Sequence, residues 1–213
     1  MNETLKRAIS GAFYVVIMWL GASYSELSFI VLFIMLGIVS IYEMWKLRNG
    51  KSKFLAFAYV LIPFILIQLI VTKEDQQNWN SNLILFMFIL TWTFDTFAYL
   101  FGVRFGKHKI MPSISPKKSW EGFGGGFVFS IIASYLSYSF FFKFEDIRIP
   151  LIISISIILP FTATLGDFIE SHYKREAGVK DSGNLIPGHG GILDRMDAFM
   201  ITIPAIYILT KLL

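Results

Sequence analysis

The chain is dominated by apolar runs that are too long and too many for the core of a small soluble protein. Seven runs fall at about 8–24, 27–44, 54–72, 82–101, 122–142, 149–169 and 198–213. A helix that crosses a bilayer needs about 20 predominantly apolar residues. A composition of 55% hydrophobic and 16% charged residues, with a mean hydropathy of +0.62, agrees with membrane insertion. We therefore predict an all-α fold, a polytopic membrane helix bundle of about seven transmembrane helices.

The positions of Lys and Arg predict the orientation of this bundle. Seven spans put alternate loops on opposite sides, and 15 of the 19 Lys and Arg then share one side with the N-terminus. The four on the other side are Lys73, Lys143, Arg148 and Lys211. Because cytosolic loops carry an excess of Lys and Arg, we expect a cytosolic N-terminus in a multi-pass protein of the cytoplasmic membrane. The two long polar loops, 102–121 and 170–197, would also face the cytosol.

Two alternative interpretations of the charge pattern are weaker. Lys6 and Arg7 precede the first apolar run, so that run alone would fit a signal peptide. Six further spans favour an uncleaved helix. The net charge of +4 arises from short clusters between apolar runs, so we expect no nucleic-acid partner. The chain has no cysteine, which excludes disulfides, thiol catalysis and zinc–thiolate sites.

Four aspartates are expected to meet just below the cytosolic surface. Asp95 lies about six residues, or about 9 Å, from the cytosolic end of its run. Asp167 lies near the end of the sixth run, and Asp194 and Asp197 share one helical face at the start of the seventh. Acids inside a membrane are costly and usually functional, and several at one depth favour a bound Mg²⁺, Mn²⁺ or Ca²⁺. Simpler alternatives are a hydroxyl partner for Asp95 and helix capping by the last two.

The two polar loops carry cations, hydroxyl groups and glycines. Lys117 and Lys118 stand beside serines and would suit either phosphates or anionic lipid headgroups. The loop 170–197 mixes cations and acids with glycines, which let a backbone approach a ligand closely. This mixture suits a metal-bound polyphosphate, with His189 as a hydrogen-bond donor rather than a base. The glycines at 124–126 would let the fifth span pack closely on a neighbour, and no GxxxxGK[ST] motif indicates a P-loop.

The segment 171–197, SHYKREAGVKDSGNLIPGHGGILDRMD, resembles the signature of the CDP-diacylglycerol synthases, also called phosphatidate cytidylyltransferases. The matching residues are Ser171, Lys174, Arg175, Lys180, Asp181, Pro187, His189, Gly190, Gly191, Asp194, Arg195 and Asp197. Residues 95–122 resemble a second block of that family, and Gly166 with Asp167 a third. The resemblance covers about the C-terminal 120 residues, whereas the first three spans match only in being apolar.

The resemblance implies a nucleotidyltransferase that converts CTP and phosphatidate into CDP-diacylglycerol and pyrophosphate, with Mg²⁺, in phospholipid biosynthesis. It assigns Asp167, Asp194 and Asp197 to the metal and, with Lys174 and Arg175, to catalysis. The implied substrate-binding residues are Asp95, Ser115, Lys117, Lys118, Ser171, Lys180, Asp181, His189, Gly190, Gly191 and Arg195. Family members are reported with a monovalent cation beside the divalent one, which makes K⁺ a candidate second ion. The expected partners are CTP, phosphatidate and membrane lipids, and a homodimer is left open.

On this interpretation the chain divides into residues 1–81, with three N-terminal transmembrane helices, and residues 82–213, the catalytic transmembrane region. One alternative is a cytidylyltransferase for another lipid phosphate, such as the archaeal ether-lipid enzyme. The complete Pro-x-His-Gly-Gly block favours the diacylglycerol enzyme. A membrane transporter is a second alternative, but it predicts broken helices at mid-depth, whereas these acids gather toward one face.

Overall fold

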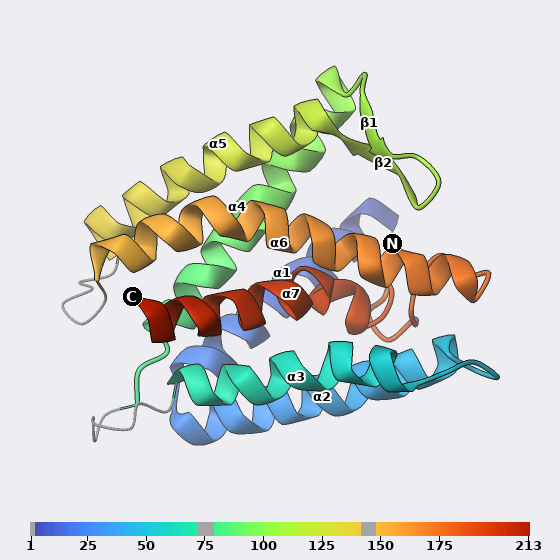
Figure 1. Cartoon of the computed structure of the whole chain (residues 1–213), viewed down its shortest axis with the longest axis horizontal. Coiled ribbons are helices and arrows are strands. Elements are labelled where there is room, and N and C mark those ends of the chain that lie inside the picture. The colour runs from blue at the N-terminus through green and yellow to red at the C-terminus, as the bar shows by residue number, and fades with distance from the viewer. Residues whose placement is uncertain (1–2, 72–78, 142–147) are drawn as a thin grey trace.

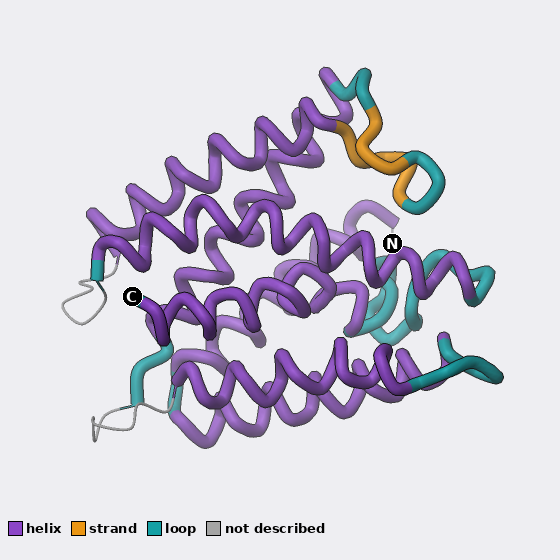
Figure 2. The backbone as a smooth tube through the Cα atoms, viewed as in Figure 1, coloured by secondary structure: helices purple, strands orange, loops and turns teal. Residues whose placement is uncertain are grey.

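Helices make up most of the chain in the computed structural model, which describes residues 3–71, 79–141 and 148–213 (Figures 1 and 2). Within these ranges there are seven α-helices: α1 (Glu3–Ser23), α2 (Glu26–Leu47), α3 (Phe54–Val71), α4 (Asn82–Phe105), α5 (Trp120–Leu136), α6 (Ile149–Glu176) and α7 (Leu193–Leu212). A π-helical segment, Ser137–Phe141, continues α5. Five helices are long and apolar enough to cross a membrane: α2, α3, α4, α6 and the segment Trp120–Phe140. The predicted all-α polytopic membrane fold is confirmed, while seven spans and a cytosolic N-terminus stay predictions.

Successive helices run in alternating directions, so the polar segments gather at one end of the bundle. The start of α1, the turn between α2 and α3, the connection from α4 to α5 and the connection from α6 to α7 lie at this end (Figure 1). The C-terminal end of α7 lies at the opposite end (Figure 1). The end of the bundle that holds the start of α1 and these three connections carries 15 of the 19 Lys and Arg. Of the four Lys and Arg expected on the opposite side of the membrane, Lys73 and Lys143 lie outside the described residues.

Close helix pairs build the bundle, chiefly α4 with α5 and α6 with α7, while α3 also packs on α7. Glycines on α5 allow its approach to α4. A Cβ atom on Gly122 would lie 2.6 Å from the Ala98 carbonyl oxygen, and one on Gly126 would lie 2.7 Å from the Phe94 ring. Apolar burial does not drive helices together inside lipid, so close packing at small residues does. Gly124 has open space around it, so the expected packing role holds for its neighbours and not for Gly124 itself.

The connection between α4 and α5 contains a β-hairpin that the sequence analysis treated as a polar loop. Strand β1 (Lys109–Met111) pairs antiparallel with β2 (Ser115–Ser119), with an irregularity between the paired positions. The amide of Trp120 donates to the His108 carbonyl at 2.9 Å and closes the base of the hairpin. Ser119 ends β2 and also caps α5, because its hydroxyl accepts from the Gly122 amide at 3.2 Å. The hairpin therefore leads directly into α5 and has little freedom at its base.

Two helices extend beyond their apolar runs into the signature segment. Helix α6 continues to Glu176, and its last turn carries Lys174 and Arg175. Cations there interact favourably with the negative end of the helix dipole. Asp167 consequently lies inside the helix, away from its unfavourable C-terminal end. Helix α7 starts at Leu193, which places Asp194 in its first turn.

Candidate active site

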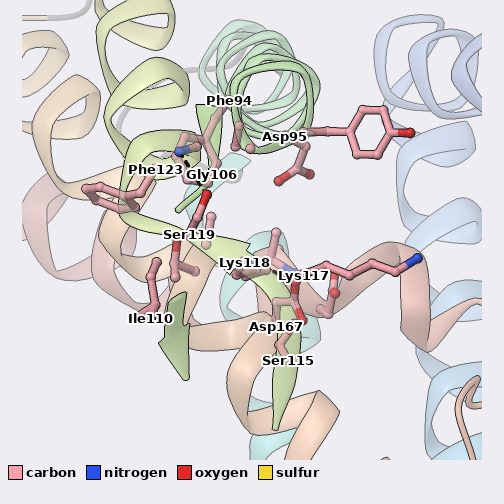
Figure 3. A pocket seen from close by; sticks show the side chains of 18 of the residues that line it. Phe94, Asp95, Gly106, Ile110, Ser115, Lys117, Lys118, Ser119, Phe123 and Asp167 are labelled. Atoms are coloured by element: carbon pink, nitrogen blue, oxygen red, sulfur yellow. Dashed lines mark hydrogen bonds and ion pairs between the residues drawn. The ribbon is translucent and has the colours of Figure 1, made fainter. Parts of the chain in front are cut away.

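One pocket of about 850 Å³ lies between α4, the hairpin, α5, α6 and the start of α7. All four predicted aspartates line it, and besides Asp95 so do four other predicted substrate-binding residues, Ser115, Lys117, Lys118 and Arg195. Figure 3 shows Asp95 pointing into this space from α4, opposite Lys118 and Asp167. Apolar groups form the remaining wall: Phe94, Ala98, Phe123 and Ala163. The pocket thus combines a charged floor with an apolar side.

The acids come together because α6 and α7 touch through their backbones. A Cβ atom on Gly166 would overlap the carbonyl oxygen of Asp197, so only glycine permits this approach. The Gly166 carbonyl in turn accepts from the Tyr59 hydroxyl of α3 at 2.8 Å. Asp167 follows Gly166 directly, and this contact therefore sets Asp167 beside Asp197.

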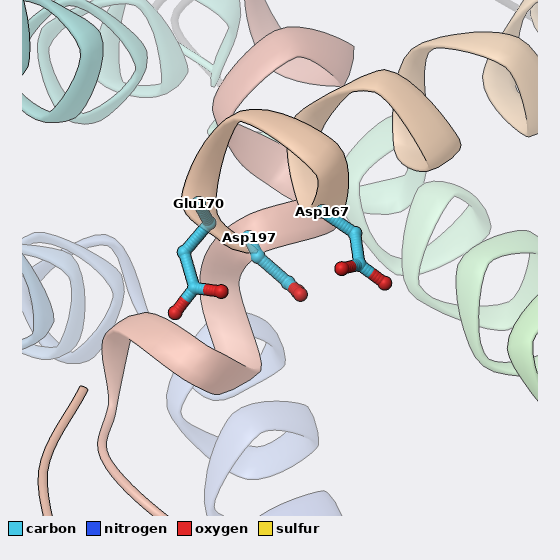
Figure 4. A group of neighbouring side chains, drawn as sticks. All are labelled: Asp167, Glu170 and Asp197. Carbon is cyan, nitrogen blue, oxygen red and sulfur yellow. The ribbon is translucent and has the colours of Figure 1, made fainter. Parts of the chain in front are cut away.

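Three carboxylates form a group that could hold a metal ion: Asp167, Glu170 and Asp197 (Figure 4). One ligand oxygen from each lies within 4.8 Å of the others. Around an octahedral Mg²⁺, opposite oxygens lie about 4.2 Å apart and neighbouring ones about 3 Å apart, so the three carboxylates would draw closer together to bind one ion. Glu170 has no exposed surface; its Oε2 pairs with the Lys174 ammonium, and its Oε1 has no hydrogen-bond partner among the described residues. Buried oxygens with unused acceptor capacity fit a hard cation such as Mg²⁺.

Two lysines reach the acids from different elements. Lys118 of the hairpin forms an ion pair with Asp167. Burial by itself would lower the pKa of Lys118, but the carboxylates of Asp167 and Asp95 outweigh it and raise that pKa above its usual value. Lys174 is buried and bridges two acids, with an ion pair to Glu170 and a 2.8 Å contact to Asp194 Oδ1. The site therefore holds fixed positive charge beside its carboxylates.

Asp194 lies at the edge of this cluster and is held by several donors. Its Oδ2 accepts from the amides of Ser182 and Gly191 at 2.9 and 2.7 Å, and from the Ser182 hydroxyl at 3.0 Å. The bond from Gly191 supports the capping interpretation, because it satisfies an amide just before α7. The carboxylate group in Figure 4 contains Glu170 where the sequence analysis placed Asp194. Direct metal binding by Asp194 stays a prediction.

The other predicted residues surround the pocket at greater distance. The Ser171 hydroxyl donates to Asp167 Oδ1 at 3.0 Å and orients that acid. Arg175 donates to the Ile114 carbonyl at 3.3 Å, which ties the end of α6 to the hairpin. His189 Nδ1 lies 2.9 Å from the Ser10 hydroxyl of α1. Lys180 and Asp181 are exposed.

Steric constraints explain why the two predicted site glycines of this loop, Gly190 and Gly191, are glycines. Gly190 has φ of +83°, and a Cβ atom there would lie 2.5 Å from Asp194 Oδ2. A Cβ atom on Gly191 would overlap the Ser182 hydroxyl. Both glycines therefore allow the backbone to wrap closely around Asp194.

Two buried acids near the site, Glu170 and Glu43, were not predicted from the sequence. Glu170 stands three residues after Asp167 on α6, so helical spacing was an available signal. Glu43 lies on α2, and its side chain accepts hydrogen bonds from Ser182, Ile192 and Leu193. The available signal for Glu43 was an acid near the end of an otherwise apolar span.

Known proteins share this sequence pattern. Residues 9–213 match the profile described as the cytidylyltransferase family. A phosphatidate cytidylyltransferase of Staphylococcus haemolyticus is 44% identical over 155 residues, which cover 73% of this chain and 56% of that relative. Those of Staphylococcus saprophyticus and Staphylococcus epidermidis are 45% and 48% identical over 154 residues, 72% of this chain and 58% of each relative. The matched region thus spans little more than half the length of these relatives. By the match along nearly its whole length, the chain belongs to the cytidylyltransferase family.

Proposed function

We propose that this chain carries the active site of a phosphatidate cytidylyltransferase, which joins CTP and phosphatidate to give CDP-diacylglycerol and pyrophosphate. The observation that carries the proposal is a single pocket with two unlike walls. Its floor holds Asp167 and Asp197 with Lys118, and its side is made of Phe94 and Phe123. Such a pocket suits a reaction between a charged nucleotide and the headgroup of a lipid. The names of the staphylococcal relatives support the same substrates.

The reaction needs charge neutralisation more than proton transfer. A phosphate monoester has a second pKa of about 6, so the phosphate of phosphatidate is largely ionised near neutral pH. One of its oxygens attacks the α-phosphorus of CTP, a new P–O bond forms, and the bond to the β-phosphate oxygen breaks. Pyrophosphate leaves with the electron pair of that bond. No general base is required, and the barrier lies in bringing two anions together.

The cations of the pocket would reduce that repulsion. Lys118 has a raised pKa, so it stays protonated at neutral pH and can contact a phosphate beside Asp167. Arg195 and the exposed Lys117 also line the pocket. The guanidinium of Arg195 would offer further N–H donors to phosphate oxygens.

A divalent cation fits the same site. Asp167, Glu170 and Asp197 would hold it, because their oxygens are grouped and Glu170 Oε1 has no hydrogen-bond partner among the described residues. When bound, Mg²⁺ would polarise the phosphate oxygens and stabilise the charge that develops on the leaving pyrophosphate. Asp194 would orient the start of α7 and, through Lys174, the Glu170 carboxylate. A monovalent second cation and a homodimer stay predictions.

The proposed location is the cytoplasmic membrane, with the pocket open toward the cytosol. The segments that carry 15 of the 19 Lys and Arg share the end of the bundle at which the hairpin lies (Figure 1). By the positive-inside rule, we expect that end in the cytosol. CTP would then enter from the cytosol, while phosphatidate would reach the apolar side of the pocket from the bilayer.

The test is pyrophosphate release by purified protein in detergent with CTP, phosphatidate and Mg²⁺. We expect release that depends on all three, and no release when diacylglycerol replaces phosphatidate, because diacylglycerol lacks the attacking phosphate. Asp197→Asn should lower the rate at least 100-fold, whereas Glu26→Gln, on the exposed first turn of α2, should leave it unchanged. A panel of lipid phosphates and nucleotides would show which substrates are preferred. Absence of pyrophosphate with every pair would contradict the proposal.

A further inference from the structure

Glu43 of α2 is a buried acid that belongs to the N-terminal helices, outside the signature segment. Its side chain is 5% exposed. Oε1 accepts from the Ile192 amide at 3.1 Å, and Oε2 accepts from the Leu193 amide and the Ser182 hydroxyl, both at 2.8 Å. The described ion pairs do not include Glu43, so neutral donors surround its carboxylate. Burying a carboxylate costs free energy unless hydrogen bonds offset it, and these three bonds do so here.

Those bonds complete the start of α7. The first amides of a helix have no partner within the helix and usually receive one from the side chain of the N-cap residue. The N-cap of α7 is Ile192, whose side chain offers no acceptor. Glu43 supplies the missing acceptors from another helix, and a carboxylate at this position also suits the positive end of the helix dipole.

The same short segment also holds Asp194. Ser182 and Gly191 donate to Asp194 Oδ2, and the Ser182 hydroxyl lies within bonding distance of both carboxylates. A Cβ atom on Gly183 would lie 2.5 Å from Glu43 Oε1, and one on Gly191 would overlap the same carboxylate. Gly183 and Gly191 therefore leave space for the Glu43 carboxylate, which a larger residue at either position would contact too closely. Glu43 and Asp194 contact one turn from two sides.

We infer that Glu43 is a positioning residue of the active site, which fixes the start of α7 and thereby the positions of Asp194 and Asp197. It does not line the pocket itself, and it acts through its bonds to Ile192, Leu193 and Ser182. The N-terminal helices thus contribute to the site through one side chain. Its effect on turnover rests on the proposed function, but its effect on the backbone of α7 does not.

The test compares Glu43→Gln with Glu26→Gln, which replaces the exposed acid at the other end of the same helix. Glutamine keeps the size of the side chain but presents an amide NH₂ to one of the donors. We expect hydrogen exchange of the Ile192 and Leu193 amides to rise at least tenfold in Glu43→Gln. The Mn²⁺ concentration for half-saturation, followed by EPR without nucleotide, should rise about tenfold, since partners of metal ligands typically change affinity by 10–100-fold. The kcat should fall by a similar factor, with the KM for CTP within about threefold of wild type.

A merely structural role predicts a different result. Glu43→Gln would then lower the folded fraction and the rate in proportion, while the folded protein kept wild-type Mn²⁺ binding and exchange at Ile192 and Leu193. That result would overturn the inference, and so would wild-type behaviour in every assay. If Glu43→Gln does not fold, Glu43→Asp keeps the carboxylate but shortens the side chain by one CH₂ group, so it should weaken the bonds to Ile192 and Leu193, and it is judged by the same measurements. If the wild type releases no pyrophosphate, the proposed function fails, and the exchange measurement still decides the role of Glu43.

Discussion

Replacing Lys174 with methionine should leave one buried carboxylate of the acid cluster without a counter-charge. Lys174 contacts Asp194 at 2.8 Å and forms an ion pair with Glu170. Methionine has a similar length and preserves most of the packing. Asp194 keeps three other donors, from Ser182 and Gly191. Glu170 keeps no hydrogen bond among the described residues, so the cost of the substitution falls mainly on Glu170.

The expected loss of stability follows from that imbalance. Removing one partner of a buried ion pair costs about 3–5 kcal/mol. A chain of this size loses about 2–4 °C in Tm for each kcal/mol, so Lys174→Met should unfold roughly 10 °C below wild type. Mg²⁺ should reduce this difference, because a cation among the carboxylates replaces part of the missing charge. Lys46→Met is the matched control, since Lys46 is exposed and its ammonium group lies 4.7 Å from the centre of the Tyr42 ring, with no ion pair among the described residues.

The assay is thermal unfolding in detergent, with and without Mg²⁺, combined with pyrophosphate release. The double variant Lys174→Met with Glu170→Gln removes the unpaired charge, so it should recover at least half of the lost stability. Its rate should stay at least tenfold below wild type, because Glu170 remains changed. Lys174→Met with wild-type stability, or a double variant less stable than Lys174→Met, would refute this account of the cluster.

Three further predictions test the backbone, the hairpin and the metal. Gly166→Ala should force α6 away from Asp197 and lower kcat at least tenfold, whereas Gly124→Ala, which meets open space, should leave kcat unchanged; equal effects would contradict the helix contact. Ser119→Ala removes the cap on the Gly122 amide and should cost about 1 kcal/mol, measured as a fall in Tm. EDTA should abolish pyrophosphate release, and Mg²⁺ or Mn²⁺ should restore it; activity that survives exhaustive chelation would exclude the metal.

The fold could be predicted from the sequence because apolar runs determine which segments enter a membrane. The seven predicted runs correspond to α1 to α7, and the helix ends differ mainly where polar residues continue a helix. Helix α6 extends to Glu176 through the signature segment, where hydropathy gives no signal. The hairpin was missed for a related reason. Its strands are short and largely exposed, with Pro112 and Pro116 within or beside them, so no alternating pattern marks them.

The candidate site was predicted in part. Helix depth alone was sufficient to place Asp95, Asp167, Asp194 and Asp197 around one pocket. The partners of these acids depend on tertiary contacts that spacing does not encode. Lys118 reaches Asp167 across a hairpin. Glu43 reaches the start of α7 from 149 residues away in the chain.

The backbone contact at Gly166 has a consequence for how the surrounding lipid would affect the site. Helices α6 and α7 touch there with no side chain between them, so they would tilt together as one body when bilayer thickness changes. The distance between Asp167 and Asp197 would then be insensitive to the membrane. Lys118, in contrast, is carried by the hairpin that joins α4 to α5, and side-chain contacts link that hairpin to α6: the Lys118 ion pair with Asp167 and the Arg175 bond to the Ile114 carbonyl. A change of membrane thickness would therefore act on the distance between Lys118 and the acids through these two side-chain contacts, and not on the distance between the two acids.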